Sequence, residues 1–300
     1  MNGKSMVICG AGGFIGSHLR KYFEEKGYQV IPVGRRELTL GTDLLAERME
    51  GADIIINLAG ESIIRRWTPA NKRKIYNSRI DTTRTLAGAV RAMKQPPIAF
   101  LNASAIGIYA DQGEHDETSQ SYAGDFLAEV CLDWEKEAST LDVLTRVIFL
   151  RFGIVLDSGQ GALAKLLPLF RMGLGGRLGS GRQAFAWIHI QDLLRAVEFL
   201  LQSPEIKGPV NFTAPEVSDN CTFTNQLARV LKRPALIPVP SFALRLIFGK
   251  GADSLLKGQH AFPATLQQAG FSFLYPTLQL ALEAIIKKKK NIVSPIRTRF

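Results

Sequence analysis

The sequence predicts an α/β fold, a doubly wound parallel sheet joined to a smaller C-terminal substrate lobe. Apolar runs of strand length alternate with segments of helical periodicity from residue 6 to residue 151. A glycine-rich turn joins the first strand to the first helix. The third strand, at 52–60, is almost wholly apolar. Such a strand is typical of a parallel sheet that is covered on both faces.

The glycine-rich turn at residues 10–16 reads Gly-Ala-Gly-Gly-Phe-Ile-Gly. Gly10 permits the sharp turn, Gly13 lets a pyrophosphate approach the backbone, and Gly16 lets the helix pack closely on the strand. The N-terminus of that helix presents free N–H groups to phosphates. The pattern predicts a dinucleotide site; a plain strand-to-helix corner is the alternative.

The second strand, at 28–33, ends at Gly34, and Arg35 and Arg36 follow it. An acidic residue about 20 residues past the glycine turn would instead favour NAD, because it binds the ribose hydroxyls. Two guanidinium groups suit the 2′-phosphate of NADP(H). The alternative is a pair of surface arginines in a loop.

The following elements are read in order. A short helix is expected at 43–50, and the third strand ends in the small residues Ala59 and Gly60, where a cofactor can lie. The later elements of this half are a long helix at 69–93, a strand at 98–104 that ends in Ser104, a polar mobile loop at 110–124, a helix at 125–139 and a strand at 143–151.

The second half is less regular. A short helix and a cluster of glycines occupy 159–181, and shorter elements and proline-separated helices follow to residue 286. We expect an NADP(H)-binding domain at 1–157 that also takes in 187–213. The substrate lobe is expected to comprise 158–186 and 214–286, and residues 287–300 a disordered basic tail.

The bulk properties fit a globular protein, with 46% hydrophobic residues and a net charge of +10. No signal segment or run long enough to span a bilayer is found, and the three cysteines are scattered, which predicts a cytoplasmic protein without a metal. Four consecutive lysines at 287–290 predict a solvated tail. The expected partner is a small-molecule substrate, with no membrane partner; nucleic acid is disfavoured, and a homodimer is left open.

Several motifs together resemble the extended short-chain dehydrogenase/reductase superfamily, and within it the small "epimerase family protein" branch, whose members are sometimes labelled cell-division inhibitor homologues. The resemblance covers residues 1 to about 286. The matching stretches are 10–16, 56–61 (Ile-Asn-Leu-Ala-Gly-Glu), 104–107 (Ser-Ala-Ile-Gly), 125–131 (Asp-Phe-Leu-Ala-Glu-Val-Cys), 170–182 and 187–192 (Trp-Ile-His-Ile-Gln-Asp).

The resemblance implies a Rossmann-type core that binds NADP(H) and a C-terminal lobe that closes over an organic substrate. The resemblance implies, position by position, which residues contact the cofactor. The pyrophosphate would be bound by Gly10, Gly13, Phe14, Ile15 and Gly16, and the 2′-phosphate by Arg35 and Arg36. The adenosine would lie along Leu58, Ala59 and Gly60, Arg79 would reach toward the cofactor, and Val155 would lie near the nicotinamide.

The chain departs from the superfamily at its catalytic dyad, a tyrosine followed four residues later by a lysine. Phe126 and Val130 stand where the resemblance places that dyad. The one Y-x-x-x-K match, Tyr22 to Lys26, lies in the first helix and is read as an i,i+4 helix pair. The remaining catalytic candidates are Ser104 and Tyr109.

Lys136, Lys165 and His189 are weaker candidates, and His189 is expected to be structural. Two functions follow from these observations. The first is an NADP(H)-dependent oxidoreductase or epimerase with an atypical active site, acting on a carbonyl or sugar-nucleotide-like substrate. The second is a non-catalytic NADP(H)-binding protein that serves redox sensing or cell division.

Overall fold

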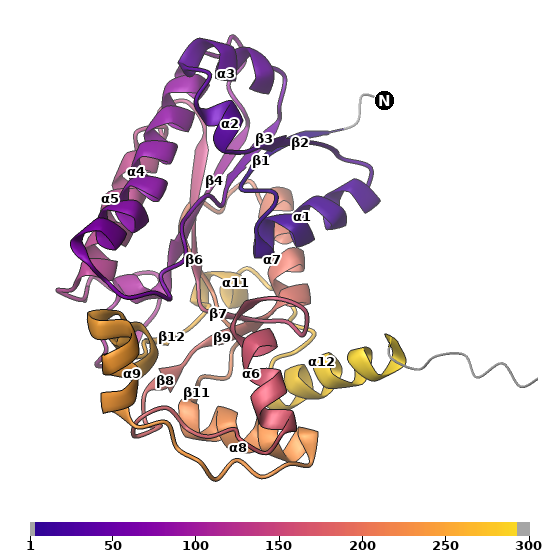
Figure 1. The fold of residues 1–300 in the computed structure, drawn as a ribbon. Helices are drawn as coiled ribbons and strands as arrows, with labels where there is room; N and C mark the ends of the chain where they lie inside the picture. Colours follow the sequence, from indigo (N-terminus) through magenta and orange to yellow (C-terminus); the bar gives the residue numbers. More distant parts are fainter. Residues whose placement is uncertain (1–3, 293–300) are drawn as a thin grey trace, which may run out of the picture.

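A computed structural model describes residues 4–292 of the 300-residue chain. Its centre is a six-stranded sheet in the order β2-β1-β3-β4-β6-β10, in which every neighbouring pair is parallel (Figure 1). The strands are β1 (Ser5–Cys9), β2 (Gln29–Val33), β3 (Ile54–Asn57), β4 (Ala99–Ala105), β6 (Arg146–Phe152) and β10 (Gly208–Phe212). The strand order reverses between β1 and β3, and ligands bind at such switch points in parallel sheets. The predicted doubly wound fold is confirmed.

Helices cover both faces of the sheet, as the apolar strands predicted. Along β1, Met6 and Ile8 face one helical layer, while Val7 and Cys9 face the other, because successive side chains alternate across a strand. The first layer contains α1 (Phe14–Glu25), α7 (Ile190–Gln202) and α11 (Ala264–Gln268). The second contains α3 (Thr42–Met49), α4 (Pro69–Ala92) and α5 (Phe126–Ser139).

A second core lies below the sheet in Figure 1. Its elements are β7 (Ile154–Leu156), α6 (Gly161–Arg171), β8 (Ala184–Phe185), β9 (Trp187–His189), α8 (Asn220–Leu231) and α12 (Leu278–Ile292), and β11 (Ser218–Asp219) pairs with β8 beside them. Leu266 and Phe271 come from the segment assigned to this lobe, yet they pack against the sheet. The division into lobes therefore stays a prediction, with chain segments crossing between the two cores.

Some short elements had no clear sequence signal. They are α2 (Arg35–Leu38), η1 (Ile106–Ile108), β5 (Glu114–His115), α9 (Ser241–Phe248), η2 (Gly249–Ala252), α10 (Asp253–Leu256) and β12 (His260–Ala261). The polar segment 110–124 contains β5, which pairs with β12 of the C-terminal lobe. The buried ring of His115 also ties this segment down through bonds to Ser119 and two carbonyl groups.

Helix α12 includes residues 287–292, which the sequence analysis assigned to the disordered tail. Lysine is a good helix former, and Lys287 Nζ lies 3.4 Å from the carboxylate of Glu283 one turn earlier. The rest of the predicted tail, 293–300, lies outside the described residues. None of the described helices is long and apolar enough to cross a membrane.

Candidate cofactor and substrate cleft

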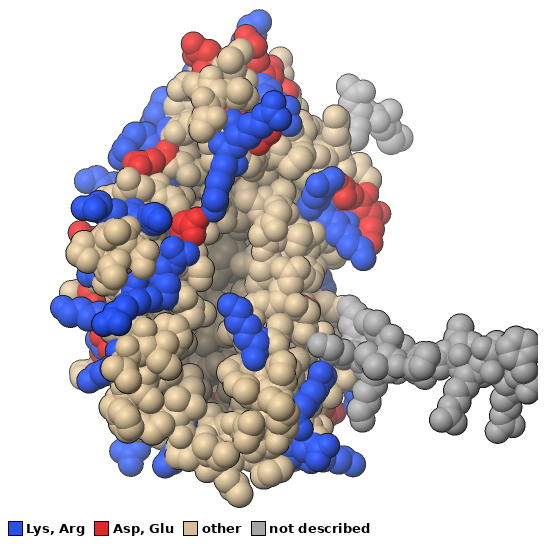
Figure 2. Space-filling model, in the orientation of Figure 1, with Lys and Arg blue, Asp and Glu red and all other residues tan. Residues whose placement is uncertain are grey.

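A cavity of about 480 Å³ lies at the carboxyl ends of the central strands, between the sheet and the C-terminal lobe. Figure 2 shows the hollow at the middle of the molecule. The glycine turn and the end of β3 line one part of it. The ends of β4 and β6, helix α5 and residues 253–259 line the other. We name these parts the cofactor half and the substrate half.

The glycine turn has the geometry that its sequence predicted. Gly10 has a φ of +83°, and a Cβ there would lie 3.1 Å from the carbonyl group of Leu58. A Cβ on Gly16 would overlap the carbonyl oxygen of Gly10, so helix α1 could not begin this close to the turn with any larger residue. The backbone thus forms a tight cradle at the switch point of the sheet.

Helix α1 points its N-terminus into the cofactor half. Its N-cap is Gly13, which has no side chain to cap the helix, and its first turn contains no acidic residue. Phe14, Ile15 and Gly16 all line the cavity. Their backbone N–H groups have no intrahelical partner, so they can bind an anion. The cradle fits a pyrophosphate.

The end of β3 forms the opposite wall of this half. Leu58 and Gly60 line the cavity, whereas Ala59 packs toward the second helical layer. Arg79 of α4 also lines the cavity, and its guanidinium carbon lies 5.2 Å from the centre of the Trp134 ring. Burial lowers the pKa of Arg79. Its Nη1 donates to the carbonyl oxygen of Ile75 at 3.0 Å, and within residues 4–292 it forms no direct ion pair, although the charge of Glu61 acts on it from further away.

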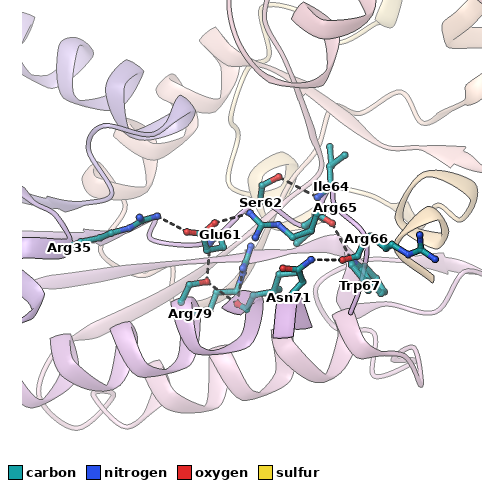
Figure 3. A network of polar contacts seen from close by, with 12 residues as sticks. Arg35, Glu61, Ser62, Ile64, Arg65, Arg66, Trp67, Asn71 and Arg79 are labelled. Atoms are coloured by element: carbon teal, nitrogen blue, oxygen red, sulfur yellow. Dashed lines mark hydrogen bonds and ion pairs between the residues drawn. The ribbon is translucent and has the colours of Figure 1, made fainter. Parts of the chain in front are cut away.

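Arg35 begins helix α2 and extends over the outer edge of the cofactor half. Its Nη2 lies 2.5 Å from Glu61 Oε1, and Arg65 Nη2 lies 2.9 Å from the other oxygen of that carboxylate (Figure 3). Arg36 is exposed. No acid stands at the end of β2 in the sequence, but Glu61, at the end of β3, meets Arg35 in the folded chain. A pair that spans 26 positions in the chain gives no local signal.

Ser104 lines the substrate half and begins a buried polar network. Its hydroxyl donates to Glu135 Oε1 at 2.6 Å. Arg151 binds both oxygens of the same carboxylate, at 2.8 and 2.7 Å. Burial alone would lower the pKa of Arg151, but the hydrogen bonds and the charge of Glu135 raise it above its ordinary value. The Ser104 proton is therefore held by the carboxylate, and the oxygen lone pairs are what Ser104 offers to the cavity.

Tyr109, the other predicted catalytic residue, is fully buried at the far end of this network and does not line the cavity. Its hydroxyl accepts from Arg151 Nη1 at 2.7 Å and donates to Asn211 Oδ1 at 2.9 Å. Its ring stacks on His115 at 5.0 Å. Burial raises its pKa even though Arg151 is adjacent. The structure thus separates the two catalytic candidates, with Ser104 at the cleft and Tyr109 behind its wall.

The remaining predicted residues are also placed. Val155 belongs to the sheet core, and its neighbour Ile154 lines the cavity instead, since side chains alternate along a strand. His189 caps α7 by accepting from the Gln191 N–H. Tyr22 and Lys26 both bind Glu198, at 2.5 and 2.6 Å, and do not line the cavity.

At the dyad positions of α5, Val130 lines the cavity and Phe126 packs against the Trp67 ring at 5.4 Å. Cys131 also lines it, and burial, together with the nearby Glu135 charge, raises its pKa to about 12. This thiol is neutral near pH 7. No tyrosine is among the described residues that line the cavity, and its one lysine is Lys257.

The C-terminal lobe was expected to close over the substrate, but the residues of its wall could not be named from the sequence. Asp253, Ser254, Lys257 and Gln259 line the substrate half from α10 and the loop after it. Gly251 packs so closely on the loop before α4 that a Cβ would overlap the carbonyl oxygen of Arg65. For this wall the sequence offers only prolines, which mark an irregular lobe without singling out the lining residues. For Glu135 the signal is Arg151, because an arginine within the apolar strand β6 requires a buried partner.

The NAD-dependent epimerase/dehydratase family model matches residues 6–212, more than half of the chain. The chain belongs to this family. A second family model, described only as a domain of unknown function, matches residues 239–285 of this chain. No group of His, Cys, Asp and Glu side chains that could hold a metal occurs in the described part of the chain.

Full-length relatives share the assignment. The epimerase family protein SDR39U1 of Mus musculus is 35% identical over 290 residues, covering 94% of this chain and 99% of the relative. YfhF of Bacillus subtilis is 34% identical over 303 residues, covering 96% and 100%. The crystal structure of human SDR39U1 with NADPH superposes with a TM-score of 0.86 at 32% identity, covering 94% of this chain and 99% of that one.

Proposed function

We propose that this chain is an NADP(H)-dependent oxidoreductase or epimerase of the extended short-chain type, with an atypical active site and a small substrate that carries a carbonyl or carbinol group. The observation that carries the proposal is the uncapped N-terminus of α1, which opens on the glycine cradle at the cleft. The NADPH complex of the human relative supports the choice of cofactor.

The chain's own residues suit each charged part of that cofactor. The first-turn N–H groups of Phe14, Ile15 and Gly16 would bind the pyrophosphate. Arg35, assisted by Arg36, would bind the 2′-phosphate, which competes with Glu61 for the guanidinium. Arg79, which has no carboxylate partner in the described structure, adds positive charge on the same side. Leu58 and Gly60 would lie along the adenosine.

NADP(H) supplies or accepts a hydride at nicotinamide C4. Ser104 contributes an acceptor lone pair, because its proton is directed to Glu135. It therefore suits a carbinol hydroxyl better than a carbonyl oxygen. Since no phenol lines the cavity among the described residues, the proton that accompanies reduction would come from water. A positioned general acid is worth ~10²–10⁴-fold, so turnover should be slow.

The second candidate is a non-catalytic NADP(H)-binding protein with a regulatory role. Val130 and Phe126 at the dyad positions, with Tyr109 sealed behind the cavity wall, favour it. The cytoplasmic location predicted from the sequence remains part of both proposals, and the three free cysteines agree with it. Turnover on any carbonyl or sugar-nucleotide substrate separates the two candidates.

The test of the proposal is a pair of calorimetric titrations, with NADPH and with NADH, on the unaltered protein and on Arg35→Ala. We expect NADPH to bind more tightly than NADH. Arg35→Ala should weaken NADPH binding about tenfold and leave NADH unchanged, because only NADPH carries the 2′-phosphate. Arg20→Ala, an exposed arginine paired with Glu24 on α1, is the matched control and should change neither affinity. Equal affinities for the two cofactors in the unaltered protein would refute the NADP(H) assignment.

A further inference from the structure

The surface of α9 and the segment before it carries apolar side chains that no part of the described chain covers. Phe242 is 73% exposed, Leu246 76% and Leu236 83%, and Ile237 and Ile247 are also more than half exposed. We name these five residues the α9 patch. Figure 2 shows an uncharged surface over the position of α9, bordered by Lys and Arg side chains.

The helix geometry shows that the exposure is built in. Leu244 is buried and anchors α9 to the lobe. Successive residues of a helix rotate by about 100°, so Phe242 and Leu246 point away from the side that Leu244 occupies. A helix that is apolar on its outer face is normally covered, and exposed apolar patches mark interaction sites.

The charge around the patch is mainly positive, although Arg245 Nη2 lies 3.9 Å from Asp253 Oδ1. From residue 232 to residue 258 five basic residues (Lys232, Arg233, Arg245, Lys250, Lys257) stand against one acidic residue, Asp253. Arg66 joins this rim from the other lobe, since a Cβ on Gly249 would lie 3.6 Å from its Cγ. Protruding apolar side chains ringed by basic ones are the pattern of a segment that lies in the interface of an anionic membrane.

We propose that the α9 patch docks this protein on the surface of an anionic lipid bilayer. Phe242, Leu246 and Leu236 would enter the boundary between headgroups and acyl chains, and Arg245 and Lys250 would meet the lipid phosphates. A second copy of this chain is a poorer occupant, because it would bring two basic rims together on molecules of net charge +10. A protein partner would need a pocket for side chains that protrude rather than line a groove.

The α9 patch is connected along the chain to the wall of the cleft. Helix α9 continues through η2 into α10, and Asp253 and Lys257 line the substrate half. Docking would hold the mouth of the cleft near the lipid surface. The sequence predicts no membrane partner, since it contains no run long enough to span a bilayer and its lysine run is typical of a solvated tail. An interfacial surface becomes visible once the orientation of a short helix is known.

The test is co-sedimentation of the full chain with phosphatidylcholine vesicles and with mixed phosphatidylcholine–phosphatidylglycerol vesicles. We expect binding to the mixed vesicles that weakens as salt is added. The double variant Phe242→Ser/Leu246→Ser should lose at least about tenfold in vesicle affinity, since the apolar contribution of both side chains is removed. Val143→Ser, at an 89% exposed apolar residue outside the patch, is the matched control and should bind like the unaltered protein.

A second pair of variants tests the basic rim. Arg245→Gln/Lys250→Gln should weaken binding to mixed vesicles, whereas Lys21→Gln, at an exposed lysine of α1, should not. NADPH titration of each variant checks that it is folded. Equal vesicle binding by Phe242→Ser/Leu246→Ser and the unaltered protein would overturn the proposal and assign the binding to the lysine-rich tail. A fall in the molecular mass of the protein in solution on the same substitution would overturn the proposal and favour a second copy as the occupant. Absence of binding to mixed vesicles by the unaltered protein would also overturn the proposal.

Discussion

The two halves of the cleft are built from different parts of the chain. In the cofactor half, backbone groups of a seven-residue turn and the start of α1 form the cradle, and only glycine fits at Gly10 and Gly16. In the substrate half, side chains from β4, α5, β6 and the C-terminal lobe form the wall. The first half agrees with the family pattern, and the second departs from it at the dyad.

The difference shows what each kind of site requires. A phosphate cradle made of backbone N–H groups depends on a short stretch of sequence with fixed spacing, and it keeps its ability to bind phosphate as long as the turn keeps its conformation. A proton-transfer site depends on individual side chains, and under our proposal the single replacement of the dyad lysine by Val130 would remove that chemistry without disturbing the fold. Binding and catalysis can therefore separate in one chain.

The largest expected effect lies in the substrate half. Arg151→Met should reduce the free energy of unfolding by about 3–5 kcal/mol, because Glu135 is left buried and unpaired. Urea denaturation measures the change. Arg84→Met, whose two ion pairs are on the surface, should cost at most about 1 kcal/mol. Similar losses for the two variants would show that the Arg151 pair is not the desolvated element that we describe.

The next effect concerns the cofactor half. Gly13→Val should weaken NADPH binding at least ~100-fold, since a branched side chain occupies the space of the pyrophosphate. The backbone of Gly13 is extended, which valine can adopt, but a Cβ there would lie 3.2 Å from the carbonyl oxygen of Gly10, so the turn must shift slightly and circular dichroism should check that the fold persists. Gly12→Ala is the matched control, because a Cβ there meets no atom within 4 Å. Undiminished binding by a folded Gly13→Val protein would make the turn a plain structural corner.

A smaller effect distinguishes the two catalytic candidates. On any carbinol substrate found in a screen of alcohols and sugar nucleotides with NADP+, Ser104→Ala should lower kcat about tenfold, because the substrate hydroxyl loses its hydrogen-bond acceptor at Ser104. Tyr109→Phe should destabilise the protein yet leave kcat nearly unchanged, because its hydroxyl does not reach the cavity. If Tyr109→Phe abolished the reaction in a stably folded protein, the Tyr109 phenol would be the general acid, which would contradict its position behind the cavity wall.

The smallest effect is expected at the Y-x-x-x-K match. Tyr22→Phe and Lys26→Met should leave NADPH affinity and turnover unchanged within about twofold, since both side chains bind Glu198 outside the cleft. Their removal affects only the contact between α1 and α7, and a partly exposed pair of this kind is worth about 1 kcal/mol or less. A large fall in turnover at unchanged stability would mean that α1 faces the substrate.

The sequence predicted a doubly wound parallel sheet, the succession of strands and helices along the chain, and the glycine turn, because those features depend on periodicity and on local glycine spacing. The order of the strands within the sheet came from the structure. It did not predict the bonds of Ser104 or Arg35. Glu135 lies 31 residues from Ser104, and Glu61 lies 26 residues from Arg35, so only tertiary packing brings them together. The wall at 253–259 escaped prediction for another reason: its short helices carry no amphipathic period long enough to read.

The most direct test of the separation between binding and proton transfer is a crystal structure of this chain with NADPH bound. We predict pyrophosphate oxygens on the N–H groups of Phe14 to Gly16, the 2′-phosphate on Arg35 in place of Glu61, and no phenol within hydrogen-bonding distance of the space beside nicotinamide C4. A structure in which Tyr109 has left Arg151 and entered that space, or in which the 2′-phosphate lies away from Arg35, would contradict this account.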